Sequence, residues 1–250
     1  VPFSDFIRIG DSYYKFKFSG MTAKARKLDM EKTPMGRLRL VCKGPRAARP
    51  RILIMGECSA FTGANFDLAA HRRGVEVPVG TYVILGGLIL RGKGERSKSV
   101  SIGTVRNPKP FEVQEGEETV VTIGAPYHYE FEAEYTARRV RIVGTSVKII
   151  GRCGEVYMDA WGAPPAPRVY CRGSGQRGGR KLGRMEVIKR TDDFIQYLSI
   201  KRQSNDWFSY EDALLAPMDF SAPKPGGGRV QLKLVSPRNP YFGKVESEWK

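Results

Sequence analysis

The residues best suited to chemistry in this chain are its cysteines and histidines. The thiols are Cys42, Cys58, Cys153 and Cys171, and the imidazoles are His71 and His128. No Cys-x-x-Cys pair occurs, and two isolated histidines supply too few ligands, so the sequence predicts no zinc site. No Gly-x-Ser-x-Gly or His-Glu-x-x-His motif is present. We therefore expect no enzyme activity, metal or cofactor. The alternative is acid–base catalysis by a pair of carboxylates that come together only in the folded chain.

Two glycine-rich stretches resemble nucleotide-binding motifs without meeting their requirements. Gly87–Lys93 fits G-x-x-x-x-G-K, but Gly94 stands where Ser or Thr must hold Mg²⁺. Gly173–Gly178 fits G-x-G-x-x-G, but no βαβ pattern surrounds it. Neither stretch predicts a nucleotide site.

The spacing of the cysteines favours two disulfides, if the protein is exported. Cys42 and Cys58 each flank a strand-like run, and the loop Gly44–Pro50 would set those strands antiparallel. Cys153 and Cys171 make the second short pair. Four buried free thiols in a cytosolic protein are the alternative, and the sequence does not decide between them.

The charge balance points to an anionic partner. The chain carries 42 basic and 26 acidic residues, a formal net charge of +16. Such an excess favours nucleic acid, acidic polysaccharide, a membrane surface or an acidic protein. Two basic tracts would serve an anionic polymer, through these residues: Arg91, Lys93, Arg96, Lys98, Arg172, Arg177, Arg180, Lys181 and Arg184. Both tracts lack the interleaved aromatic residues that stack bases.

Short strand-like runs separated by Gly and Pro predict an all-β fold, which must position the cysteines, histidines and basic residues. The pattern is clearest over Val75–Tyr157 and indicates an antiparallel β-sandwich, Ig-like or transthyretin-like, with very little helix. We expect three regions: a β-rich N-terminal region over residues 1–74, the sandwich over 75–160, and a β-rich C-terminal region over 161–250. The last contains a Gly/Arg-rich loop and could pack with the first.

Alternation predicts which faces of two hairpins are buried. Gly10-Asp11 is a turn between strands, and in Tyr13–Phe18 the alternation places Tyr14, Phe16 and Phe18 on one face, with Lys15 and Lys17 on the wet face. In Tyr129–Tyr135 the alternation places Glu130, Glu132 and Glu134 on one face and the aromatic residues on the other. Arginines of the following strand, Arg139 and Arg141, are expected to face those glutamates.

The central region also resembles a known group of domains. Pro78-Val-Gly-Thr-Tyr82 looks like the P-x-G-x-Y signature of carboxypeptidase-regulatory-like, transthyretin-like and collagen-adhesin B-type domains, and Phe111–Val121 is similar to their next motif. The resemblance implies a seven-stranded sandwich in which Tyr82 packs inward, often exported and used as a stalk or adhesive module. It carries over no active-site residue.

The preferred function is a non-enzymatic, exported structural or binding protein, at the cell surface or in a filament. Lys24–Arg51 has ten basic and two acidic residues, whereas Phe111–Tyr135 has seven glutamates and no Lys or Arg. Opposite patches on different faces favour self-association. The aromatic tail would anchor the contact through Tyr241, Phe242 and Trp249. Neutralisation within the monomer, with the tail on its own core, is the alternative. An anionic polymer is the alternative partner.

The expected location is extracellular or at the cell surface, with the cytoplasm as the alternative. The chain begins at Val1 rather than Met, which suggests a removed leader or a trimmed start. No run of 18 apolar residues occurs, so no transmembrane segment is expected.

Overall fold

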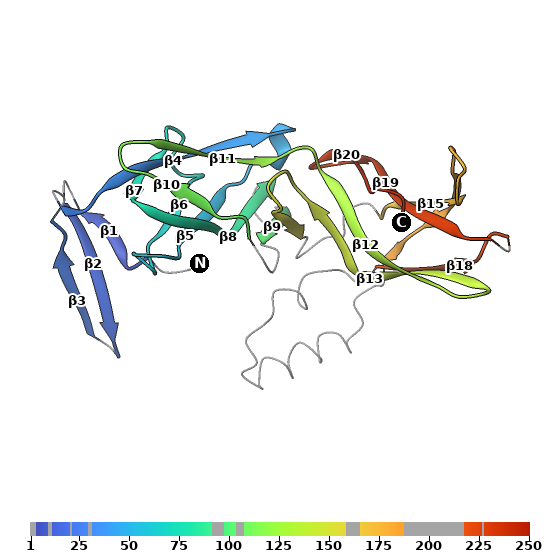
Figure 1. Cartoon of the computed structure of the whole chain (residues 1–250), viewed down its shortest axis with the longest axis horizontal. Helices are drawn as coiled ribbons and strands as arrows, with labels where there is room; N and C mark the ends of the chain where they lie inside the picture. The colour runs from blue at the N-terminus through green and yellow to red at the C-terminus, as the bar shows by residue number, and fades with distance from the viewer. Residues whose placement is uncertain are drawn as a thin grey trace.

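The computed structural model describes residues 4–9, 12–20, 22–29, 32–91, 98–103, 108–158, 166–187, 218–226 and 228–250. Within these ranges the chain is almost entirely β, with one 3-10 turn at Arg46–Ala48 and no α-helix, which confirms the all-β prediction. The molecule is elongated, with β1–β3 at one end and β15, β18 and β19 near the other (Figure 1). No helix in these ranges is long and apolar enough to cross a membrane.

The half of the molecule nearer β1–β3 is a sandwich of two β-layers. One layer is the three-stranded sheet of β4 (Met35–Lys43), β7 (Val75–Pro78) and β11 (Glu118–Gly124). The facing layer contains β5 (Ile52–Glu57), β6 (Asn65–Asp67), β8 (Gly80–Arg91), β9 (Lys98–Gly103) and β10 (Phe111–Val113). The two layers face each other in Figure 1. Apolar side chains that alternate along these strands fill the space between them.

The second half continues the same hydrogen-bonded sheet. From β9 it runs through β14 (Val156–Met158), β13 (Arg139–Ile150), β12 (His128–Tyr135), β20 (Gly243–Glu246), β19 (Val230–Asn239), β15 (Arg168–Gly173) and β16 (Arg180–Arg184). β18 (Met218–Pro223) joins β13, and β17 (Glu186–Val187) joins β18. Buried residues of β12, β13, β15 and β19 extend the core into this half.

Strand pairing does not follow the expected boundary at residues 74/75. β4 and β5 belong to the expected N-terminal region, but β4 pairs with β7 and β11, and β5 pairs with β8. The sandwich therefore includes the chain from Met35 onward. The β4–β11 pair is also parallel, so the sheets are mixed rather than purely antiparallel.

Tyr82 packs inward, as expected. Its side chain is fully buried, and its hydroxyl donates a hydrogen bond to the carbonyl of Pro78 at 2.8 Å. The residue therefore closes the turn between β7 and β8 from inside the core.

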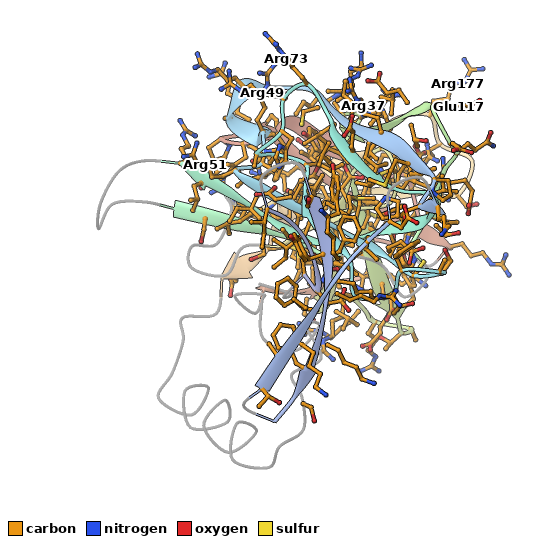
Figure 2. All side chains as sticks on the ribbon, turned by 90° about the vertical axis from the view of Figure 1, so that its left-hand side faces the viewer. Arg37, Arg49, Arg51, Arg73, Glu117 and Arg177 are labelled. Atoms are coloured by element: carbon orange, nitrogen blue, oxygen red, sulfur yellow. The ribbon has the colours of Figure 1, made fainter. Side chains whose placement is uncertain are left out.

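The N-terminal hairpin forms, but its buried face is the opposite of the one expected. β1 (Phe6–Ile9), β2 (Ser12–Ser19) and β3 (Thr22–Lys27) form a separate antiparallel sheet. Tyr13 is buried with Phe6 against Phe61 and Phe66, whereas Phe18 is 52% exposed. The anchoring aromatic residues come from the segment after β5, so the face with Tyr13 turns inward at the base of the sheet. Figure 2 shows β2 and β3 extending away from the body.

The acidic hairpin is correctly predicted in its main features. β12 and β13 are antiparallel, with Glu134 opposite Arg141 and 3.5 Å between the Arg141 guanidinium and the Glu134 carboxylate. Tyr129 and Phe131 are buried on the inner face. Arg139 instead donates from Nε to Ser221 Oγ at 3.1 Å, because β18 borders this end of β13.

Candidate anion-binding surface

The four cysteines are free thiols, which corrects the predicted disulfides. Cys42 lies in β4, and Cys58 follows β5, so the two residues belong to opposite layers of the sandwich rather than to neighbouring strands. Cys153 lies in the turn between β13 and β14, and Cys171 lies in β15. The thiols in each predicted pair are therefore not close.

Cys153 belongs to a buried cluster of titratable groups around Glu155. Glu155 is 2% exposed and accepts hydrogen bonds from the Gly124 amide at 2.6 Å and the Cys153 amide at 3.0 Å. It also accepts from the Tyr157 hydroxyl at 2.7 Å and the Cys153 thiol at 3.1 Å. A Cβ at Gly151 would collide with this carboxylate.

The electrostatics of the cluster keep the Cys153 thiol and the Tyr127 phenol protonated. Burial, then the hydrogen bond to Glu155, raises the pKa of Cys153 to about 12. Burial and the Glu155 charge raise the pKa of Tyr127 to about 12. A thiol held in this form is a poor nucleophile. The geometry instead holds together the turn from β13 to β14 and the end of β11.

Glu57 does a similar structural task at the other layer. Its carboxylate is 4% exposed and accepts from the amides of Phe61 at 2.6 Å and Thr81 at 3.2 Å, and from the Ser59 hydroxyl. It therefore fixes the loop after β5 against β8. In the described part of the chain, no group of three or more His, Cys, Asp or Glu side chains could hold a metal ion.

The clearest ligand-binding geometry is on the outer face of β16, β15 and β19, which lie side by side in that order. In β15, Val169 and Cys171 are buried, so Arg168, Tyr170 and Arg172 share the outer face. Tyr170 is paired in register with Lys181 of β16 on one side and Lys233 of β19 on the other. We call this surface the C-terminal basic face: Arg168, Tyr170, Arg172, Lys181, Arg184, Lys233 and Trp249. Arg180 is paired in register with the buried Cys171, so it is exposed at the edge of the sheet beside this face.

Trp249 completes this face from the end of the chain. Residues 247–250 run beside β19, with hydrogen bonds between the backbones of Leu232 and Lys250. The Arg172 guanidinium lies 4.5 Å from the centroid of the Trp249 ring, and the Lys233 ammonium lies 6.0 Å from it. A Cβ at Gly179 would collide with the indole, so glycine is what lets the ring lie against the β15–β16 loop.

Most cations of this face have no acidic partner. Lys233 contacts Glu246 at 3.4 Å. Among the described residues, no carboxylate forms an ion pair with Arg168, Arg180, Lys181 or Arg184. Arg168 and Arg184 are even paired with each other in register.

A pocket of about 390 Å³ opens at the loop end of this face. Its lining includes Arg172, Gln176 and Arg180 from the β15–β16 hairpin, and Pro225 and Gly226 from the loop before β19. Two guanidinium groups and an amide at a concave site suit an anionic group such as a phosphate. The side chain of Arg177 points outward in Figure 2.

The two predicted basic tracts are not brought together in the described residues. Arg91 donates from Nη1 to the Pro240 carbonyl at 2.8 Å and lies over Tyr241 at 5.8 Å, so it braces the β19–β20 turn. Lys93 and Arg96 lie outside the described residues, as does the side chain of Lys98. The second tract does form a face. Sequence reasoning missed Tyr170, although the alternation in Arg168-Val-Tyr-Cys-Arg172 would have placed it between the two arginines.

The structure also corrects the expected assembly anchor. Tyr241 and Phe242 are 4% and 5% exposed, and Phe242 packs between Tyr127 and Tyr157 with centroid distances of 4.7 and 4.8 Å. The tail therefore covers its own core, and only Trp249 is half-buried at the surface.

The oppositely charged segments meet within the monomer where β4 pairs with β11. β4 of the basic segment pairs with β11 of the acidic segment, and Arg39 Nε lies 2.7 Å from the Glu118 carboxylate. Arg37, whose side chain points outward in Figure 2, reaches Glu76 of β7 at 3.9 Å. Part of each charged segment is therefore neutralised within the monomer, which is the alternative to head-to-tail assembly.

Compared with protein-family models, curated proteins and solved structures, the chain matches none of them.

Proposed function

We propose that the protein is a non-enzymatic binding protein whose C-terminal basic face binds single-stranded nucleic acid. The observation that supports it is Tyr170, held in register between Lys181 and Lys233 on an exposed sheet face. Proteins that bind single strands combine cations that follow the backbone with aromatic side chains on which bases stack. The aromatic residues missing from the basic tract in sequence are supplied by neighbouring strands.

The roles divide between two kinds of side chain. Arg168, Arg180, Lys181 and Arg184 contact phosphates, because no acid of the described chain neutralises them. Tyr170 offers a half-exposed ring to a base, and Trp249 is held against the face by Arg172. Binding of this kind depends on salt and shows little preference for sequence.

Acidic polysaccharide is the alternative ligand, and the aromatic residues separate the two. A polysaccharide needs the cations, whereas a nucleic acid also gains from stacking, which is worth about 1–3 kcal/mol per base. Tyr170→Ala should therefore weaken the affinity for nucleic acid by roughly 5- to 150-fold. It should change the affinity for a heparin-derived oligosaccharide of similar charge far less.

The test is fluorescence anisotropy with labelled dT20 over a range of salt. With four to five phosphate contacts, log K should fall with log salt at a slope of about −3 to −3.5. Arg180→Ala with Lys181→Ala should reduce the slope magnitude by about 1.4. The matched control, Arg72→Ala with Arg73→Ala, removes the same charge from an exposed turn elsewhere.

Two results would contradict the proposal. The first is equal weakening by both double variants, which means that only net charge matters. The second is a pair of observations: Tyr170→Ala binds dT20 with unchanged affinity, and Arg180→Ala with Lys181→Ala loses binding of the heparin-derived oligosaccharide. That result would assign the face to a polysaccharide.

Self-association remains the second candidate function, now through the N-terminal sheet. Ile7, Ile9 and Phe18 are 36%, 56% and 52% exposed, and the register places all three on one face. Among the described strand residues, the register places a single charged side chain, Lys27, on that face. A second copy could therefore cover it, as facing layers cover each other in a sandwich. Export to the cell surface is a separate proposal, and it rests only on the all-β chain and its even number of cysteines.

A further inference from the structure

The other face of the N-terminal sheet carries a cluster of cations. Lys17 of β2 is paired in register with Lys24 of β3, and the next pair toward the base is Lys15 with Arg26. Residues two apart along a strand point to the same side, so the four cations share one face. Tyr13 precedes them on that face and anchors the sheet to the body. We call this group the N-terminal cation cluster.

These pairs work against the stability of the sheet. Directly opposite residues on neighbouring strands lie about 4.5–5.5 Å apart at Cβ, and like charges there are destabilising. Lysines on an edge strand have a general explanation, because they prevent the edge from pairing with other chains. That explanation covers Lys24 and Arg26 of β3. It does not cover Lys15 and Lys17, because β2 is the central strand of the sheet.

No acid in the described chain compensates the outer pair. Residues 12–28 contain five basic residues and no Asp or Glu. Lys17 and Lys24 are exposed, and neither forms an ion pair with a described residue. Lys15 lies 5.6 Å from the centroid of the Phe61 ring. At the base of the sheet, Glu76 accepts from the Tyr13 hydroxyl at 3.3 Å and pairs with Arg37, and Asp29 pairs with Lys32 at 3.1 Å.

We propose that the N-terminal cation cluster is a second binding site for the phosphates of single-stranded nucleic acid. Two adjacent pairs of cations, about 6.7 Å apart along the strands, match a run of negative charges better than a single anion. The site lies at the opposite end of the long axis from the C-terminal basic face (Figure 1). The chain is then bivalent and joins two strands, or two segments of one strand. This bridging role rests on the proposed function of the C-terminal face, whereas the second site does not.

The test counts bound oligonucleotides per chain. Labelled dT15 is titrated into the full-length protein at low ionic strength, and the stoichiometry is measured by sedimentation velocity. The wild type should bind two. Lys17→Ala with Lys24→Ala should bind one, and Arg180→Ala with Lys181→Ala should also bind one. The matched control is Lys27→Ala with Arg73→Ala, which should bind two. Lys27 lies on the opposite face of β3, in register with Tyr14.

Each outcome separates the two sites. A wild type that binds one dT15, lost only in the Arg180/Lys181 variant, overturns the second site and leaves the proposed function standing. One dT15 lost only in the Lys17/Lys24 variant supports the second site and overturns the proposed function. Two bound in the Lys17/Lys24 variant overturns this inference. Binding of a heparin-derived oligosaccharide but not dT15 at the cluster also overturns it.

Discussion

Replacing Glu155 with Gln should destabilise the protein strongly, although the two side chains have the same shape. The carboxylate accepts two hydrogen bonds at Oε1, from Gly124 and Tyr157, and two at Oε2, from the amide and thiol of Cys153. Gln keeps one acceptor oxygen, so its amide nitrogen must face the Cys153 N–H. A buried donor left without a partner costs about 1–3 kcal/mol. The two remaining bonds lose about 1 kcal/mol each when the charge disappears.

The neutral amide is easier to bury than a carboxylate, which offsets part of this loss. We therefore expect the free energy of unfolding to fall by about 3 kcal/mol. Urea unfolding measures it, and with an m-value near 3 kcal/mol/M the midpoint should fall by about 1 M. Glu130→Gln is the control, because Glu130 is 54% exposed on β12. It should change stability by less than about 0.5 kcal/mol. A loss below about 1 kcal/mol for Glu155→Gln would refute the structural role of this carboxylate.

Two further predictions concern pH and self-association. The native protein holds the Tyr127 proton to a pKa of about 12, whereas the unfolded chain loses it near 10.0, so the free energy of unfolding should fall as pH rises through this range, by up to about 1.4 kcal/mol per pH. Cys153 adds to this loss of stability above pH 9.0, where the unfolded thiol loses its proton and the native thiol keeps it. Urea unfolding measures the stability, and a free energy of unfolding that stays constant above about pH 9 would contradict both shifts. For self-association, sedimentation equilibrium should show a dimer of the wild type that Phe18→Ser weakens by about 10-fold or more, since the substitution removes a large apolar side chain from the contact. A strictly monomeric wild type at high concentration would rule out this second candidate function.

Local alternation was enough to predict most strands and the faces of some. In β12 the glutamates point outward and Tyr129 and Phe131 point inward, as the two-residue period requires. The same reasoning failed for β2, because both faces of Tyr13–Phe18 carry aromatic residues. The buried face was decided by Phe61 and Phe66, which are distant in sequence. Alternation limits the choice to two faces, and tertiary packing selects one.

Pairings between distant strands were beyond the sequence pattern. The loop between Cys42 and Cys58 suggested neighbouring antiparallel strands, but β4 crosses to the other layer and pairs in parallel with β11. Parallel pairing needs a long connection, and no local turn residue announces it. The wrong Cys42–Cys58 pairing has this origin, as does the pairing of β4 and β5 with strands beyond residue 74. The basic tract of Arg172–Arg184 was visible in sequence, whereas its aromatic partner Trp249 reaches it only through the pairing of the tail with β19.

The distribution of ion pairs separates the structural charges from those we assign to binding. In several pairs arginines meet acids across strands, as in Arg39–Glu118 and Arg141–Glu134. At the two ends, cations meet cations in register: Lys17 with Lys24, and Arg168 with Arg184. Each opposite-charge pair stabilises a sheet by a few tenths of a kcal/mol, and each like-charge pair costs a similar amount. A sequence that satisfies this rule in the first two pairs and breaks it in the last two retains repulsion where an anionic ligand would relieve it.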